Sequence, residues 1–379
     1  MANILRGACI GFGFISSKGH APSYRQRSSS PGDFEIVAIA DICLERQLEA
    51  RRQFPKARIY SSWEELLRQE QNNLDFVDIT TPPYAHAEIA NRALGCGLHV
   101  LCEKPIAASP DEAFSMVEMA SRMKRVLFPC HNYRHAPVVK SVRSLLQAGA
   151  IGEVRLITLQ TFRPTHARGV VEWRPDWRRE RRYSGGGIAM DHGSHTFYLA
   201  FEWMRSYPTS VTAKATTLGS FDTEDNLSCT LTFPTGMATA HLTWTAGARR
   251  VLYTLHGDRG TIIVDDDDVR LLGDVTQANN RTNDLPSTIT VPSNWMDASH
   301  KEWFNSLLCD FRAAIEYHRW VSHDTLDALT CMNTIHAAYS SANQHSREVT
   351  IDDAVRRMRI AATPMRPQKP ITAVALSDS

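Results

Sequence analysis

The sequence predicts an α/β fold joined to an α+β fold. The N-terminal part should form a doubly wound parallel sheet, and the C-terminal part should form a large, mostly antiparallel open sheet covered by helices. Three observations support this prediction: a length of 379 residues, a regular alternation of apolar strands with helices up to residue 130, and a change to strands of alternating polarity after Gly152. A chain of this length is longer than a domain with a single hydrophobic core usually is. We therefore expect domains at 1–130 and 131–363, with a tail at 364–379.

Buried, almost wholly apolar strands alternate with helices in the first half. Such alternation requires right-handed crossovers and produces a parallel sheet. A helix after residue 109 is indicated by Ser109-Pro110-Asp111-Glu112, which puts Pro in the first turn and acids near the positive end. The expected strands span 5–10, 34–40, 75–80, 98–102 and 126–130, and the expected helices span 17–27, 42–54, 63–70 and 88–95.

Strands of alternating polarity dominate the second half, as expected for an antiparallel sheet with one covered face. The four acids at 265–268 fall between two such strands, where a solvated turn is favoured over a metal site. The expected strands span 153–161, 210–217, 226–233, 237–245, 250–257 and 260–265, followed by helices at 301–320 and 325–345.

Gly11-Phe12-Gly13-Phe14-Ile15-Ser16 interrupts the chain directly after the first strand. Two glycines in a tight turn let the backbone approach a pyrophosphate, whose charge is stabilised at the following helix N-terminus. Gly11, Gly13, Phe14 and Ile15 are the expected contacts. Ser16 stands at the third position of this fingerprint, where Gly or Ala is usual.

Asp41 follows the second strand, 28 residues after Gly13. A carboxylate in this position accepts the hydroxyls of an adenosine ribose and repels a 2′-phosphate, so NAD is favoured over NADP. Asp41 is also a candidate N-cap for the helix at 42–54.

Composition excludes several classes of function. A net charge of +1 argues against a polyanion-binding surface, so nucleic acid is not an expected partner. No apolar run approaches the roughly 18 residues of a membrane span, and no signal region precedes the first strand, so we expect a cytoplasmic protein. The eight cysteines are scattered without Cys-x-x-Cys or zinc spacing, so no metal site is expected. Cys102 is a possible nucleophile, although nothing near it in sequence looks like its base.

Several motifs in order resemble one known family. They are Thr81-Pro82-Pro83-Tyr84-Ala85-His86, the run from Gly97 to Glu103-Lys104-Pro105, Asn132-Tyr133-Arg134, Gly149-Ala150-Ile151-Gly152, and the segment from Gly185-Gly186-Gly187 to Asp191 and His195. Together they resemble the Gfo/Idh/MocA family, which includes glucose-fructose oxidoreductase and inositol dehydrogenase. The resemblance implies a Rossmann domain that binds NAD(P), and a second domain that holds substrate and forms a homodimer or homotetramer through its sheet.

Asp191 and His195 are four residues apart, so on a helix they share one face. A histidine titrates near neutrality and can take the proton of a carbinol, which makes His195 the expected general acid/base. The resemblance adds Lys104 and Asp191 as catalytic partners. It implies nicotinamide-side contacts at Thr81, Pro82, His86, Glu103 and Lys104, and substrate contacts at Asn132, Tyr133, Trp177, Arg178, Asp191 and His195.

The expected activity is NAD(P)-dependent hydride transfer between nicotinamide and a secondary alcohol or ketone of a small polyhydroxylated substrate: a sugar, a cyclitol or a derivative. Two alternatives remain open. One is a glycosidase- or epimerase-like enzyme with tightly bound NAD that is recycled in place. The other is a non-catalytic sensor, against which Lys104, Asp191 and His195 argue.

Seven arginines lie between residues 163 and 182, interleaved with Trp173 and Trp177. Most are expected to be solvated, but Arg178 is the candidate for a phosphate or carboxylate of the substrate, because guanidinium groups bind such oxyanions bidentately. The seven are Arg163, Arg168, Arg174, Arg178, Arg179, Arg181 and Arg182.

Overall fold

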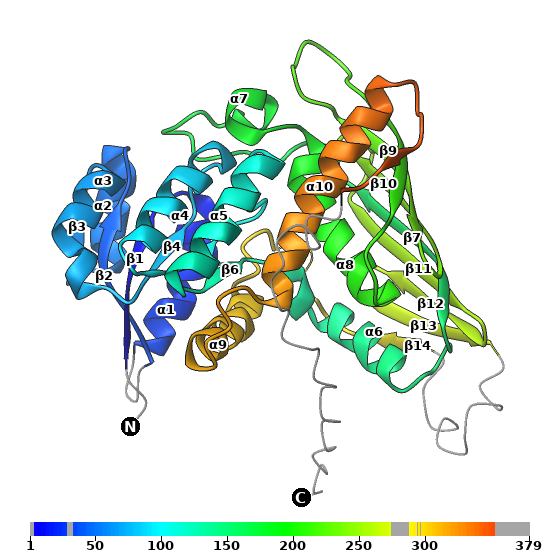
Figure 1. Cartoon of the computed structure of the whole chain (residues 1–379), viewed down its shortest axis with the longest axis horizontal. Helices are drawn as coiled ribbons and strands as arrows, with labels where there is room; N and C mark the ends of the chain where they lie inside the picture. Colours follow the sequence, from blue (N-terminus) through cyan, green and yellow to red (C-terminus); the bar gives the residue numbers. More distant parts are fainter. Residues whose placement is uncertain (1–3, 29–32, 274–287, 294, 296, 353–379) are drawn as a thin grey trace, which may run out of the picture.

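The computed structural model describes residues 4–28, 33–273, 288–293, 295 and 297–352. It shows two sheets, each with its own helices, set side by side with helices between them (Figure 1). The predicted tail at 364–379 lies outside the described residues.

The first sheet is parallel and has the strand order β3-β2-β1-β4-β5-β6, as expected for a doubly wound sheet. The order reverses between β1 and β4, and the carboxyl ends of these two strands define the crevice where such sheets bind ligands. The strands are β1 (Leu5–Ile10), β2 (Phe34–Ala40), β3 (Arg58–Tyr60), β4 (Phe76–Ile79), β5 (His99–Cys102) and β6 (Leu127–Pro129).

Successive residues of these strands enter two different cores, as the period of a strand requires. On one face Ala8, Val77 and Val100 pack with α4 (His86–Gly95) and α5 (Pro110–Met123). On the other, Cys9, Phe76 and Leu101 pack with α1 (Ala21–Arg27) and α9 (Lys301–Glu316). Helix α9 comes from the far end of the chain, so the first core is completed only when residues of the second half return to it.

The predicted helix signals produce the observed caps. Ser109 accepts a hydrogen bond from the Glu112 N–H at the start of α5, and Ser62 accepts one from Glu65 at the start of α3 (Trp63–Glu70). Helix α2 (Leu44–Gln53) begins two residues later than expected. Short 3₁₀ turns follow at Gln71–Asn73, Pro83–Ala85, Asn132–His135 and Trp177–Arg179.

The second sheet has nine strands in the order β14-β13-β12-β11-β7-β10-β9-β8-β15. All neighbours are antiparallel except the central pair β7 and β10, which run parallel. The strands are β7 (Val154–Phe162), β8 (Ser210–Thr216), β9 (Asn226–Phe233), β10 (Gly236–Thr243), β11 (Arg250–Gly257), β12 (Gly260–Asp265), β13 (Asp268–Gly273), β14 (Thr288–Thr290) and β15 (Val349–Thr350).

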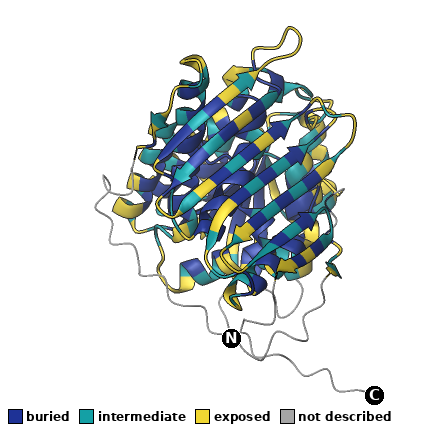
Figure 2. Cartoon of the chain, turned by 90° about the vertical axis from the view of Figure 1, so that its right-hand side faces the viewer, coloured by how far each residue is buried: buried dark blue, intermediate teal, exposed yellow. Residues whose placement is uncertain are grey.

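One face of this sheet is covered by helices and the other is open. Helices α6 (Pro137–Gln147), α8 (Ser194–Met204) and α10 (His323–Asn343) lie between it and the first domain, and the short α7 (Arg181–Ser184) lies above α4 and α5 of the first domain (Figure 1). Seen from the other side, buried and exposed residues alternate along its strands (Figure 2). The run at 265–268 forms the predicted turn between β12 and β13.

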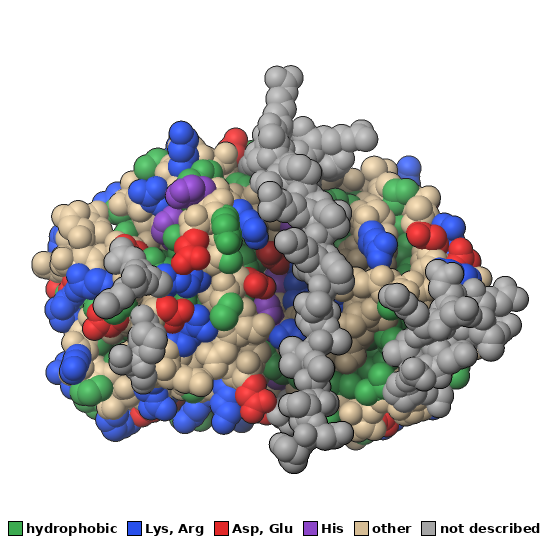
Figure 3. Space-filling model, turned by 90° about the horizontal axis from the view of Figure 1, so that it is seen from below, with side chains coloured by type: hydrophobic (Ala, Val, Ile, Leu, Met, Phe, Trp, Pro, Cys, Tyr) green, Lys and Arg blue, Asp and Glu red, His purple; other side chains and the backbone are tan. Residues whose placement is uncertain are grey.

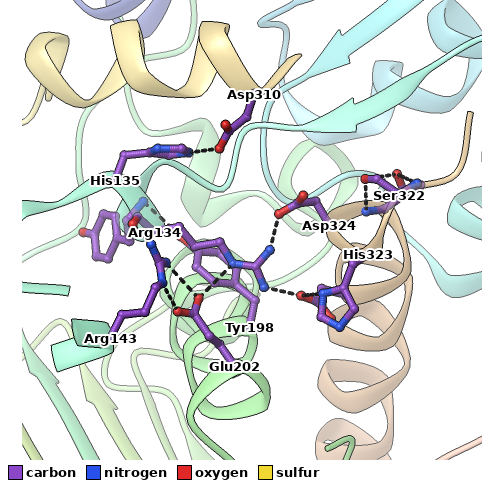
Figure 4. A network of polar contacts seen from close by, with 12 residues as sticks. Arg134, His135, Arg143, Tyr198, Glu202, Asp310, Ser322, His323 and Asp324 are labelled. Atoms are coloured by element: carbon purple, nitrogen blue, oxygen red, sulfur yellow. Dashed lines mark hydrogen bonds and ion pairs between the residues drawn. The ribbon is translucent and has the colours of Figure 1, made fainter. Parts of the chain in front are cut away.

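A buried ionic cluster joins helices of the second domain to the segment after β6. The Arg134 guanidinium bonds Asp324 and Asp327 of α10 and lies 3.3 Å from Glu202 of α8, while Arg143 of α6 also bonds Glu202 (Figure 4). The Tyr207 hydroxyl donates to Asp327 over 2.7 Å. Because Asp327 is fully buried, its charge depends on these partners.

Basic and acidic side chains are interspersed on the face seen from below (Figure 3). Among the described residues, no helix combines the length and the apolar character that crossing a membrane requires.

Candidate active site

A cavity of about 740 Å³ lies between the two domains. Its walls come from the carboxyl ends of β1, β4 and β5 and from segments of the second domain at 163–178 and 184–195. The predicted site residues that line it are Gly11, Gly13, Phe14, Ile15, Asp41, Thr81, Pro82, Glu103, Lys104, Asn132, Tyr133, Trp177, Arg178, Asp191 and His195. One predicted residue, His86, is not part of the lining.

The glycine turn leaves space for a phosphate-containing group. A Cβ at Gly13 would meet no atom within 4 Å, so the backbone there faces open space. The following helix begins as a π-helical turn (Ile15–His20) that continues into α1, and the first N–H groups of a helix lack intrahelical partners. The buried Thr81 hydroxyl also has no hydrogen-bond partner. These features fit a dinucleotide, whose pyrophosphate Gly13, Phe14 and Ile15 would hold.

Asp41 lies at the end of β2 on the same cavity. Its carboxylate accepts the Phe12 N–H over 2.6 Å and the Cys43 N–H over 2.8 Å, so it fixes the glycine turn as well as facing the cavity. Burial raises its pKa, against the effect of these two donors. Helix α2 starts at Leu44 with Cys43 as its N-cap, so Asp41 is not the N-cap residue.

His86 stabilises the backbone next to the cavity. Its ring is fully buried, with Nε2 2.7 Å from the carbonyl oxygen of Thr81 and Nδ1 3.0 Å from that of Pro105, and the protonated nitrogen donates to its neighbour. It therefore connects two cavity-lining segments from behind, and burial lowers its pKa. His86 belongs to the motif from which it was predicted, but its ring lies behind the cavity wall and not at the cavity surface.

A buried network beneath the cavity was not expected from the sequence. His20 Nδ1 lies 2.7 Å from Asp78 Oδ2, and its Nε2 lies 3.1 Å from Glu103 Oε1. The Tyr24 hydroxyl donates to the same Asp78 oxygen. Burial opposes the imidazolium, but Asp78 and Glu103 outweigh it and raise the pKa of His20 to about 9. The sequence does not predict this network, because the two acids that contact His20 lie 58 and 83 residues away in the chain.

Lys104 joins the first domain to the second. Its Nζ donates to the Asp191 carbonyl oxygen over 2.9 Å and to Asp191 Oδ1 over 3.1 Å. Arg178 Nε lies 3.3 Å from the same Oδ1. Burial opposes ionisation of Asp191, but Lys104 and Arg178 outweigh it and hold the pKa of Asp191 well below its usual range. The predicted anion ligand Arg178 is thus already paired.

His195 lies in α8 with its ring against the cavity. The ring stacks on Tyr133 with centroids 3.8 Å apart, and Nδ1 lies 2.9 Å from the Tyr198 hydroxyl. Burial, followed by the Lys104 charge, lowers the pKa of His195 well below its usual value. No bond between Asp191 and His195 is present, because Asp191 sits in a π-helical turn (Ala189–Gly193) that opens the ordinary helical spacing.

The triple-glycine segment is held by Glu224. Its carboxylate accepts the N–H groups of Gly187 and Ala189, both over 2.9 Å, and the Tyr339 hydroxyl. A Cβ at Gly187 would lie 1.9 Å from the Glu224 carbonyl oxygen, so only glycine fits there. This close approach fixes the turn that presents Asp191.

The segment at 163–184 spans the cavity. Glu172 lies 3.3 Å from Arg46 of α2, and the Tyr183 ring packs against Tyr84 of the first domain. Several cavity-lining residues were not singled out as site residues from the sequence: Arg46, His192, Arg249 and His300, together with Arg163, which appeared only as one of the arginine cluster.

Cys102, the candidate nucleophile, is fully buried, and burial raises the pKa of its thiol. It does not line the cavity, so no nucleophilic role is supported.

Comparison with protein families identifies both halves of the chain. Residues 5–131 match a family described as "Oxidoreductase family, NAD-binding Rossmann fold", and residues 139–263 match the "GFO/IDH/MocA C-terminal domain".

Among curated proteins, the chain is similar to an uncharacterised oxidoreductase, YdgJ, of Escherichia coli K12, with 28% identity over 69% of this chain and 72% of that protein. It is also similar to levoglucosan dehydrogenase of Pseudarthrobacter phenanthrenivorans, with 29% identity over 50% of this chain and 49% of the relative. D-glucoside 3-dehydrogenase of Escherichia coli K12 is 30% identical over 50% and 51%. The chain thus spans about half the length of the last two.

Among solved structures, levoglucosan dehydrogenase in complex with NADH and levoglucosan aligns with a TM-score of 0.79 and 22% identity, covering 92% of this chain and all of that one. GenD2 from gentamicin A biosynthesis, in complex with NAD, aligns with a TM-score of 0.74 and 22% identity over 93% and 97%. At this identity the alignments establish the fold.

The His20 network predicts a loss of stability at alkaline pH. The folded pKa of about 9 lies above the unfolded value of 6.5, so the contribution is complete below pH 6.5 and is lost as the pH rises through 9. The free energy of unfolding should fall by roughly 3 kcal/mol across this window. Urea unfolding from pH 6 to 10 measures it.

The test variant is His20→Gln, which should remove most of this pH dependence of stability. The matched control is His256→Gln, on the exposed part of β11, which should keep it. An equal slope in wild type and His20→Gln would contradict the assignment.

Proposed function

The chain belongs to the Gfo/Idh/MocA family of NAD-binding oxidoreductases, and we propose that it transfers hydride between nicotinamide and a secondary alcohol or ketone of a sugar, a cyclitol or a derivative. The observation that supports this most directly is one cavity that contains both the glycine turn and the group Lys104, Tyr133, Asp191 and His195. The named sugar dehydrogenases among the relatives support the same substrate class.

His195 is proposed as the general acid/base. With Nδ1 engaged by Tyr198, its Nε2 is the nitrogen left for a substrate hydroxyl. The lowered pKa keeps the imidazole neutral at physiological pH, so it can accept the carbinol proton during oxidation and return it during reduction. Bound NAD supplies the hydride acceptor, and the residues supply position and proton transfer.

Lys104 and Asp191 position the reacting groups. The Lys104 ammonium has three donors, of which two are directed at Asp191, and it keeps one for the substrate oxygen. A cation there stabilises negative charge that develops on the oxygen as the proton leaves. Asp191 holds Lys104 in place, and Tyr133 supports the His195 ring by stacking.

A second candidate, with NAD recycled in place and no net redox change, is supported by the segment at 163–184. This segment crosses the cavity and reaches the first domain through Glu172 and Arg46. A cofactor enclosed in this way would leave slowly.

One experiment separates the two candidates. The protein is purified without added nucleotide and denatured, released NAD is quantified, and NADH absorbance is followed with a panel of polyols. An exchangeable site with NADH formed from one polyol supports the dehydrogenase. Stoichiometric NAD without external NADH, and with the substrate nevertheless converted, supports internal recycling. No conversion of any compound would contradict both.

His195→Ala should lower turnover by about a hundredfold or more, because the proton must then reach solvent unaided. The NAD dissociation constant, measured by calorimetry, should stay unchanged because the ring lies at the substrate side. His345→Ala, at an exposed position after α10, is the control. Near-normal turnover in His195→Ala would remove it from the proton transfer.

Asp41→Asn tests the ribose contact. The amide oxygen can still accept one of the two N–H groups that Asp41 binds, from Phe12 or from Cys43, but the charge that repels a 2′-phosphate is lost. Selectivity for NAD over NADP should narrow by about tenfold, or about 1.4 kcal/mol. Glu88→Gln, another cavity-lining carboxylate, should leave it unchanged. Unaltered selectivity in Asp41→Asn would exclude the contact.

We also infer that the open face of the second sheet forms the contact of a homodimer or homotetramer. This face carries Leu156, Met237 and Leu272, each at least one-third exposed on a broad, uncovered surface (Figure 2). Light scattering should show an assembly that Met237→Lys weakens and that Leu218→Lys, in the loop after β8, does not. A monomeric wild type would contradict it.

A further inference from the structure

Two arginines of the cavity wall have no carboxylate partner. We propose that Arg163 and Arg249 bind an oxyanion, a carboxylate or a phosphate, carried by the substrate. This inference rests on the proposed function of the cavity and specifies the class of its substrate.

Arg163 directly follows β7 and is only 7% exposed. Its Nη1 donates to the carbonyl oxygen of its neighbour Phe162, over 3.0 Å, and its buried Nη2 has no hydrogen-bond partner. Within the described part of the chain, no carboxylate lies within ion-pair distance of it. A buried guanidinium without an anion is costly, because neither water nor a counter-charge compensates its desolvation.

Arg249 lies before β11, and its buried Nε also has no partner. Burial, together with the positive charge of Arg163, lowers its pKa, so the two guanidinium groups repel each other. The nearby acid Asp266 is engaged elsewhere: it lies 3.5 Å from Arg250 Nε and accepts the Val251 N–H over 2.8 Å. An oxyanion between the two arginines would satisfy the free donors and relieve the repulsion.

The remaining cations of the cavity differ from this pair, because each is paired with an acid. Lys104 and Arg178 are both paired with Asp191, and Arg46 with Glu172. Arg168 is paired with Asp176 over 3.2 Å. We therefore place the proposed anion at Arg163 and Arg249 instead of at Arg178, which was the candidate from the sequence.

The pair lies within reach of the proposed reaction centre. His300 also lines the cavity with a buried, unpartnered Nδ1, and burial together with Arg249 lowers its pKa to about 3, so it is neutral. Its ring centroid is 5.7 Å from that of Tyr133, which also stacks on the His195 ring. Because His195, Arg163 and Arg249 line the same cavity, the proposed ligand would place a hydroxyl near His195 and its oxyanion near the arginines.

The test uses the NADH-loaded protein and three probes: D-glucose, D-glucuronate and D-glucose 6-phosphate. Dissociation constants come from calorimetry, which does not require turnover. At least one of the two anions should bind about tenfold or more tighter than glucose, as expected for hydrogen bonds to a charged group. The anion that binds more tightly, D-glucuronate or D-glucose 6-phosphate, identifies the preferred oxyanion as a carboxylate or a phosphate.

Arg163→Gln and Arg249→Gln should abolish this preference without changing the affinity for glucose or for NADH. Arg163→Lys should restore it partly, because it keeps the charge but not the planar fork. Arg182→Gln, an exposed arginine of the same segment that is paired with Glu180 and does not line the cavity, is the matched control and should keep the preference. The inference is overturned if neither anion is preferred, or if the Gln variants weaken NADH binding equally, since the arginines would then hold the cofactor phosphates. Anion binding without turnover of any polyol would instead count against the proposed function alone.

Discussion

The ion pair between Lys104 and Asp191 is the contact on which the cavity depends. Lys104 belongs to the segment after β5, and Asp191 belongs to the π-helical turn before α8. Their ion pair therefore joins the two domains at the point where their cavity-lining segments meet. Both side chains are largely buried. In such surroundings each charge is stable only with its partner in place, which makes the relative position of the segments well determined.

Each half of this contact is supported from behind by a further charged group. Behind Lys104, the His20 imidazolium lies between Asp78 and Glu103 and connects the first helix with β4 and β5. Behind Asp191, the Glu224 carboxylate holds the backbone of Gly187 and Ala189. Farther away, Arg134 joins α8 and α10 to the end of the first sheet. Burial raises the cost of an unpaired charge, so these networks favour a single arrangement of the elements.

Local patterns predicted most of the fold and of the cavity lining. Gly13, Asp41 and Lys104 occupy ends of strands, and in a parallel sheet such ends meet at one edge whatever the details of packing. Contacts between residues far apart in the sequence were not predictable. Helix α9 completes the first core from the far end of the chain, β7 pairs in parallel with β10, and His20 contacts two acids 58 and 83 residues away. The spacing of Asp191 and His195 suggested contact, but a π-helical turn changes that geometry.

The arginines near the cavity fall into two groups: those paired with an acid, which support the structure, and those without an acidic partner. Sequence could only see that Arg163 and Arg178 belong to one basic cluster, because pairing depends on residues far along the chain. In the fold, Arg178 and Lys104 share the carboxylate of Asp191, and Arg179 is paired with the buried Asp225. Arg163 is equally buried, and its positive charge acts on Arg249, another cation. A protein that neutralises its other buried charges so consistently would not be expected to leave these two beside each other unless a ligand supplies the missing anion.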